Sequence, residues 1–263
     1  MRVILLTHGG AGPIIKKLSL LENVDLVAVF IETATTPKRS ISEKIKRSFK
    51  YDGTLATIRK FIPFGRKTTD GDGNVEDDTT DVAVNCGVTV FNVDNYHTEH
   101  SLKLMRETNA DLGVVFGTNI IKESVFSIPK MGSINLHQGL APYYRGGPPV
   151  FWELFNDEKE VGITVHFVAA AVDTGDIIQQ LKVPLEYDPA FGLDYDAFIE
   201  KYRIKLKEFS VELIVDSVKM LAEGNVLTTK QDTSLGKRYR LPVKKEKDEL
   251  KRRLKLRLEA SGR

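Results

Sequence analysis

The sequence predicts an α/β fold built on a mostly parallel sheet. Short apolar runs alternate with helix-like segments along most of the chain, which is the pattern of successive β-α-β units. The runs are apolar at nearly every position, as expected for strands that are covered on both faces. The composition, 41% hydrophobic and 28% charged over 263 residues, is that of an ordinary globular protein.

Seven segments have the composition of strands. The first leads into a glycine-rich turn and Pro13, and proline suits the first turn of a helix. The last two segments are expected to pair with each other. The predicted strands span residues 3–7, 25–31, 88–93, 112–117, 132–137, 162–168 and 176–185.

Two predicted helices have definable ends. Thr98 or Ser101 is expected to cap a helix that runs to about Thr108. A longer helix is predicted from near Asp194 to Gly224, because glycine readily ends a helix. Its apolar residues recur every three or four positions and define one buried face. They are Phe198, Tyr202, Leu206, Phe209 and Leu213.

Two regions depart from the alternation. Residues from about 33 to 80 are predicted to be an insertion with one helical segment and a mobile tip. Residues 237–263 hold twelve Lys/Arg against four Asp/Glu, so this end carries +8 and the rest −6 of the total +2. We therefore expect one domain over residues 1–225, containing the insertion, and a basic extension over residues 226–263.

The basic extension is predicted to end in an amphipathic helix, because Leu250, Leu254 and Leu258 lie four apart. Its apolar side would suit packing on a second copy of the chain, in a homodimer. Nucleic acid is not the expected partner, since Tyr239 is the only aromatic residue among these charges. Cys86 is the only cysteine, and no window approaches the ~20 apolar residues of a membrane helix. A cytoplasmic protein without a membrane partner is expected.

Asn135 and His137 carry the first chemical signal. They lie two apart at the end of a predicted strand, so their side chains point to the same face. Ligands of open α/β sheets bind beyond the carboxyl ends of the strands. An amide can donate to an oxyanion and an imidazole can move a proton, which suits acyl transfer. A hydrogen-bonded structural histidine is the alternative, and the pair alone does not decide between them.

Asp173 is the second candidate, in a loop that Gly175 allows to bend tightly. A carboxylate there could keep an imidazole charged or take protons through water, although Asp-x-Gly is also ordinary turn chemistry. Gly10 and Gly12 follow the first strand and are candidates for binding a substrate phosphate through main-chain amides, or for a purely geometric turn.

No metal site is expected. The stretch DGDGNVEDDTTD resembles a calcium loop but has Val75 where such loops need glycine. His97 and His100 could suggest a metal site, but they have no third ligand nearby in the sequence.

Two ordered motifs resemble one protein family. INLHQGLAPYYRGG (134–147) is similar to the Asn-x-His signature of formyltransferases that use 10-formyltetrahydrofolate, and GITVHFVAAAVDTGDII (162–178) is similar to their second signature. The resemblance covers about residues 82–185, and residues 1–31 more loosely. It implies a Rossmann-like, doubly wound sheet with helices on both faces.

The resemblance also implies the site. The family's catalytic residues fall on Asn135, His137 and Asp173, with 10-formyltetrahydrofolate as co-substrate and no metal. Main-chain groups of two loops are expected to contact the pterin: Phe116, Gly117, Thr118, Asn119 and Ile120, and Ala169, Ala170, Ala171 and Val172. The acceptor is expected to contact Gly10, Gly12, Tyr144, Arg145 and Gly146.

The implied reaction is formyl transfer to a primary amine of a small acceptor. Gly139 stands where the family usually has serine, which resembles branches that formylate nucleotide-linked amino sugars, the acceptor we expect. Glycinamide ribonucleotide, another amine, or water in a formyltetrahydrofolate hydrolase are the alternatives, followed by a non-catalytic folate-binding protein. Only about forty residues follow the long helix, too few for a further β-rich domain, so initiator tRNA is not the expected acceptor.

Overall fold

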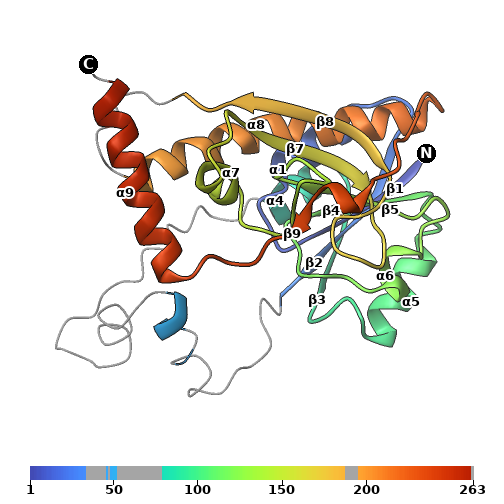
Figure 1. Ribbon diagram of the computed structural model, residues 1–263. Helices are drawn as coiled ribbons and strands as arrows, with labels where there is room; N and C mark the ends of the chain where they lie inside the picture. Colours follow the sequence, from blue (N-terminus) through green and yellow to red (C-terminus); the bar gives the residue numbers. More distant parts are fainter. Residues whose placement is uncertain (34–45, 47, 52–78, 187–194, 262–263) are drawn as a thin grey trace.

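The computed structural model describes residues 1–33, 46, 48–51, 79–186 and 195–261 (Figure 1). At its centre the described strands form a sheet in the order β3-β2-β1-β4-β5-β7-β8. The first five pair in parallel, whereas β7 runs antiparallel to both β5 and β8. The strands are β1 (Arg2–Thr7), β2 (Asp25–Glu32), β3 (Thr89–Val93), β4 (Leu112–Phe116), β5 (Ser133–His137), β7 (Glu160–Phe167) and β8 (Ile177–Pro184).

The predicted α/β fold with its mostly parallel sheet is confirmed, and every predicted strand is present. The expected pairing of the last two strands is also found, and it is antiparallel. Only a short loop joins β7 to β8, whereas a parallel pair needs a crossover of a dozen or more residues.

Helices cover both faces of the sheet (Figure 1). One core contains side chains of α1, α4, α7, α8 and α9, and the other contains side chains of α5 and α6. Alternate residues of β1 enter the two cores, as the period of a strand requires. The helices are α1 (Gly12–Leu18), α4 (Thr79–Asn85), α5 (Glu99–Glu107), α6 (Glu123–Phe126), α7 (Phe151–Phe155), α8 (Tyr195–Ala222) and α9 (Lys244–Ser261).

The two helices with predicted ends are present. Thr98 caps α5, where its side chain accepts a hydrogen bond from the Ser101 amide. After α8, Gly224 adopts φ +71°, a conformation that glycine takes without strain. The predicted face of α8 is wrong in its second half, because Phe209 is 38% exposed. The buried face continues instead through Ser210 and Ile214, and the serine hides this continuation from a count of apolar residues.

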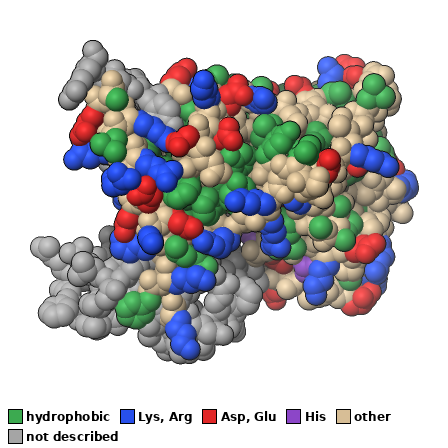
Figure 2. Space-filling model, in the orientation of Figure 1, with side chains coloured by type: hydrophobic (Ala, Val, Ile, Leu, Met, Phe, Trp, Pro, Cys, Tyr) green, Lys and Arg blue, Asp and Glu red, His purple; other side chains and the backbone are tan. Residues whose placement is uncertain are grey.

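The end of the chain is integrated into the domain. Leu250 and Leu254 of α9 are buried in the same core as α8, so the expectation that these side chains pack on a second copy of the chain is wrong. Figure 2 shows basic and acidic side chains interspersed over α9. Many are paired, including Lys244 with Asp248 and Arg253 with Glu249. This surface is therefore less basic than the count of lysines and arginines implies.

A second, two-stranded sheet lies beside the main one. It pairs β6 (Tyr144–Arg145) in parallel with β9 (Lys237–Arg238), which follows a single helical turn at Thr233–Leu235. Most of the predicted insertion lies outside the described residues, and so does most of the stretch that resembles a calcium loop, whose last three residues are in α4. In the part of the chain that is described, no helix is long and apolar enough to cross a membrane.

Candidate active site

A cavity of about 630 Å³ opens at the carboxyl ends of β4 and β5. The strand order reverses between β1 and β4, so the cavity lies beside the switch point at which ligands of open α/β sheets bind. Its volume suits one small ligand. The loops predicted to contact a pterin both line it, together with the predicted catalytic side chains: Phe116–Ile120, Ala169–Val172, Asn135, His137 and Asp173.

Strand pairing brings the nitrogen-bearing side chains of the site together. Asn135 and His137 alternate with buried Ile134 and Leu136 on β5, so they share the other face of the strand. In the antiparallel register of β5 and β7, Asn135 lies opposite His166. The side-chain amide of Asn135 donates to Nε2 of His166 at 3.4 Å.

The loop between β7 and β8 carries Asp173 in a strained conformation. Its φ is +54°, a region that residues other than glycine rarely adopt. Gly175 lies against the main chain of Phe167, so a Cβ at this position would overlap the Phe167 carbonyl. The Thr174 hydroxyl closes the turn by donating to the Ala171 carbonyl at 2.9 Å. Close packing of the loop on β7 therefore directs Asp173 toward the end of β5.

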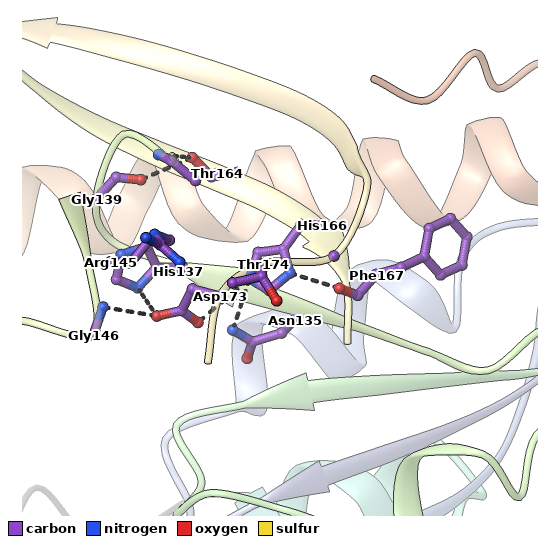
Figure 3. A network of polar contacts seen from close by, with 12 residues as sticks. Asn135, His137, Gly139, Arg145, Gly146, Thr164, His166, Phe167, Asp173 and Thr174 are labelled. Atoms are coloured by element: carbon purple, nitrogen blue, oxygen red, sulfur yellow. Dashed lines mark hydrogen bonds and ion pairs between the residues drawn. The ribbon is translucent and has the colours of Figure 1, made fainter. Parts of the chain in front are cut away.

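Asp173 lies between two imidazoles (Figure 3). Its Oδ2 is 3.4 Å from Nδ1 of His137, and its Oδ1 is 3.4 Å from Nε2 of His166. The Gly146 amide donates to Oδ2 at 2.9 Å. All three side chains are nearly enclosed: Asp173 is 10% exposed, His137 11% and His166 2%.

The second ring nitrogen of each histidine is hydrogen-bonded to a main-chain carbonyl. His137 Nε2 donates to the Tyr144 carbonyl at 2.7 Å, and His166 Nδ1 donates to the Phe167 carbonyl at 2.7 Å. A carbonyl only accepts, so these nitrogens carry the protons of the neutral rings. The nitrogens that face Asp173 are then free of protons, and an extra proton on either ring would be shared with the carboxylate.

The electrostatics favour a charged carboxylate beside a neutral imidazole. Burial lowers the pKa of His137 below its ordinary 6.5, although the Asp173 charge and the bond to Tyr144 oppose this effect. Burial raises the pKa of Asp173, but its interactions with His166 and His137 and the bond from the Gly146 amide outweigh that effect and bring the pKa to about 2. Asp173 is therefore ionised throughout the neutral range.

His166 was missed in the sequence, although it lies in the second motif. It was one polar residue inside a strand of apolar ones, and such a histidine is usually structural. The signal in the sequence was its place inside an apolar strand, where a polar side chain is buried and needs a hydrogen-bond partner. The structure shows His166 to be buried. The pairing with Asn135 supplies that partner, but it depends on a strand register that the sequence does not reveal.

The residues expected to contact an acceptor are not all brought together. Gly146 lines the cavity, whereas the side chains of Tyr144 and Arg145 do not. The Tyr144 hydroxyl donates to Glu158 at 2.7 Å, and the Arg145 guanidinium donates to the main-chain carbonyl of Pro142 at 3.1 Å. Both side chains are used to hold the surrounding structure.

Gly10 and Gly12 do not line the cavity either, but Gly10 lies next to it. A Cβ on Gly10 would be 4.0 Å from Nζ of Lys207, and Lys207 lines the cavity together with Arg203. These two cations, one turn apart on α8, were also missed. Their signal was two basic residues at a spacing of four on one helix face.

The described residues hold no group of His, Cys, Asp and Glu that could bind a metal ion. His97 has an evident structural role, because its Nδ1 pairs with the Asn95 side chain at 3.0 Å and its Nε2 accepts from the Lys122 amide at 3.0 Å.

Comparison with known proteins supports the resemblance of the two motifs. A methionyl-tRNA formyltransferase of Bacteroides fragilis is 34% identical over 134 residues, which are 51% of this chain and 39% of that protein. The chain thus spans about two fifths of this relative's length. Among solved structures, a phosphoribosylglycinamide formyltransferase of Anaplasma phagocytophilum superposes with a TM-score of 0.59 at 19% identity, covering 91% of this chain and 99% of the other.

A sugar N-formyltransferase of a Shewanella species superposes with a TM-score of 0.55 at 16% identity, covering 91% of this chain and 76% of the other. At such identities these two structures establish the likeness of fold alone. The formyl transferase family matches this sequence over residues 27–190, a span that contains β5, β7 and the Asp173 loop. The chain therefore belongs to the formyl transferase family.

Proposed function

We propose that this protein transfers a formyl group from 10-formyltetrahydrofolate to a primary amine. The observation that carries the proposal is the linked network of Asn135, His137, His166 and Asp173 at one end of a ligand-sized cavity. The pterin would lie against the loops 116–120 and 169–172, whose main-chain groups can read its edges. The alanines of the loop 169–172 leave room for a flat ring and offer no charge to it.

The chemical step needs an oxyanion donor and a proton acceptor. The acceptor amine attacks the formyl carbon, and the carbonyl oxygen becomes an oxyanion. One N–H of Asn135 is directed to His166, which leaves the second N–H for that oxyanion. Collapse of the intermediate breaks the bond between the formyl carbon and N10 of the folate, and the proton lost by the amine ends on N10.

His137 would carry that proton. The expectation that Asp173 keeps His137 permanently charged conflicts with burial, which lowers the histidine pKa. A neutral ring with a bare nitrogen 3.4 Å from a carboxylate is instead ready to accept a proton and be stabilised by Asp173. The charged form is then an intermediate of the reaction, and it can return its proton to N10.

The acceptor we favour is a nucleotide-linked amino sugar. Arg203 and Lys207 line the cavity, and Lys207 reaches the turn at Gly10, so an anionic group is expected at this end. A diphosphate would supply that charge while the sugar amine extends toward Asn135. The phosphate of glycinamide ribonucleotide would fit the same cations, and solved relatives of both kinds share the fold.

A methionyl-tRNA acceptor is the second candidate, because curated relatives carry that name. The same cations would then contact the phosphates near the end of the tRNA. The expectation against initiator tRNA rested on the number of residues after α8, and the names of these relatives favour keeping methionyl-tRNA as a candidate.

An acceptor screen tests the proposal. The protein is incubated with 10-formyltetrahydrofolate and, separately, nucleotide amino sugars, glycinamide ribonucleotide or methionyl-tRNA, and mass spectrometry detects a gain of one formyl group. His137→Asn and Asp173→Asn should each abolish transfer, while His100→Asn, in α5 outside the cavity, serves as a matched control with unchanged rate. Formate release without an acceptor would indicate a hydrolase. Folate binding without formate or any formylated product would refute catalysis.

A further inference from the structure

The segment after α8 packs against the elements that form the active site. We call residues 229–240 the strap. It contacts two separate parts of the chain at the site: β6 with the adjoining Gly146, and the loop 168–176 that carries Asp173. These contacts are hydrogen bonds from main-chain and side-chain groups, together with ring contacts.

The strap provides the only described strand that pairs with β6. Its β9 forms the two-stranded sheet with β6, and the Tyr239 amide donates to the Arg145 carbonyl at 2.7 Å. The Arg145 guanidinium reaches back and donates to the carbonyls of Thr233 and Gly236 at 3.3 and 3.4 Å. Main-chain hydrogen bonds and the Arg145 side chain thus both join β6 to the strap.

Rings and close packing fix the distance between strap and β6. The Tyr239 ring stacks on Tyr144 with 5.2 Å between centroids and lies 5.1 Å from the Trp152 ring. The Trp152 indole donates to the Arg240 carbonyl at 2.8 Å. Gly236 approaches the chain so closely that a Cβ would overlap the Pro142 carbonyl and the Cα of Tyr143.

The strap also holds the loop of Asp173. Ile177, the first residue of β8, and Thr229 exchange main-chain hydrogen bonds of 2.8 and 2.9 Å. The Gln231 side chain donates to the Gly175 carbonyl at 2.6 Å. Gly175 is two residues from Asp173, so the strap contacts the loop on the carboxyl side of the catalytic carboxylate.

These contacts converge on two main-chain groups of the site. The Tyr144 carbonyl accepts the proton of His137 Nε2, and the Gly146 amide donates to Asp173. Both belong to β6 or the residue after it. A shift of β6 would therefore move the partners of His137 and Asp173 together.

We propose that the strap positions the catalytic pair, with Arg145, Gly236 and Gln231 as positioning residues that act through the main chain of β6 and of the Asp173 loop. This inference rests on the proposed formyl transfer. It assigns Arg145 a different role from acceptor binding, and it makes residues 229–240 part of the active site although none of them lines its cavity.

Three full-length variants test the proposal. Gly236→Ala inserts a methyl group between strap and β6, Arg145→Met removes the guanidinium bonds, and Gln231→Met removes one bond while changing the packing least. Leu235→Ala is the matched control, because this strap residue is 58% exposed. Each variant is assayed for kcat, for folate affinity by calorimetry, and for the imidazole signals of its five histidines by ¹H–¹⁵N NMR.

We expect kcat to fall on the order of 10- to 100-fold, as for catalytic groups displaced by about 1 Å, with folate affinity within about twofold of wild type. The His137 signals should shift in the same variants, and Leu235→Ala should change neither quantity. Wild-type kcat and unchanged His137 signals in Gln231→Met and in any folded variant at Gly236 or Arg145 would overturn the proposal. An inactive wild type with shifted His137 signals would refute the reaction and leave the positioning intact.

Discussion

Replacing Glu153 with glutamine should stabilise the protein, and increasingly so as the pH rises. Glu153 lies on α7, where its neighbours Phe151, Trp152 and Leu154 are also buried. Only 3% of Glu153 is exposed. Burial raises its carboxyl pKa from 4.5 to about 7, partly offset by its own main-chain amide and reinforced by the charge of Glu158.

The magnitude follows from this shift. The folded state binds the proton more tightly than the unfolded state, so the favourable contribution is complete below pH 4.5 and is lost as the pH rises to about 7. At 1.36 kcal/mol for each pKa unit, ionisation of the buried carboxyl costs about 3 kcal/mol at pH 8 and less than about 1 kcal/mol at pH 5. Glutamine has nearly the same shape and cannot ionise, so it removes this pH-dependent cost.

Urea unfolding of wild type and Glu153→Gln at pH 5 and pH 8 measures the effect. Glu153→Gln should exceed wild type in unfolding free energy by about 3 kcal/mol at pH 8 and by less than about 1 kcal/mol at pH 5. Glu22→Gln on the surface is the control and should change stability by less than about 0.5 kcal/mol at both values. An equal effect of Glu153→Gln at both pH values would show that Glu153 ionises normally and would refute the reasoning.

Three further predictions concern the cavity. His166→Gln should lower kcat about 10- to 100-fold, because the imidazole that orients the Asn135 amide and lies beside Asp173 is lost. An unchanged rate in steady-state assays would assign His166 a purely structural role. Asp173→Asn should lower the pKa of His137 further, because it removes the charge that opposes burial; an NMR titration in which that pKa rises would contradict this account. Lys207→Met should raise the KM of an anionic acceptor about tenfold and leave folate binding unchanged. Lys219→Met, near the end of α8, is the control and should alter neither quantity. Equal KM values for the two variants would exclude Lys207 from acceptor binding.

The sequence determined the parts of this protein that depend on neighbours along the chain. Apolar runs identified the strands, and Thr98 and Gly224 marked ends of helices, because strand composition and capping act over a few residues. The joint placement of Asn135 and His137 was predictable, because residues two apart on a strand share one face. Asp173 entered through its motif.

Tertiary structure decided what joins these residues. His166 meets Asn135 only through the register of two antiparallel strands, and Lys207 reaches the cavity only because α8 packs beside α1 and across β7 and β8. The protonation of His137 depends on burial, which is a property of the whole fold. The basic extension shows this most clearly. Its sequence indicated a charged extension with an amphipathic helix, whereas in the structure residues 229–240 form main-chain contacts with β6 and with the start of β8. Composition records which side chains are present, whereas main-chain hydrogen bonds between distant segments, such as those of Tyr239 and Thr229, leave no trace in it.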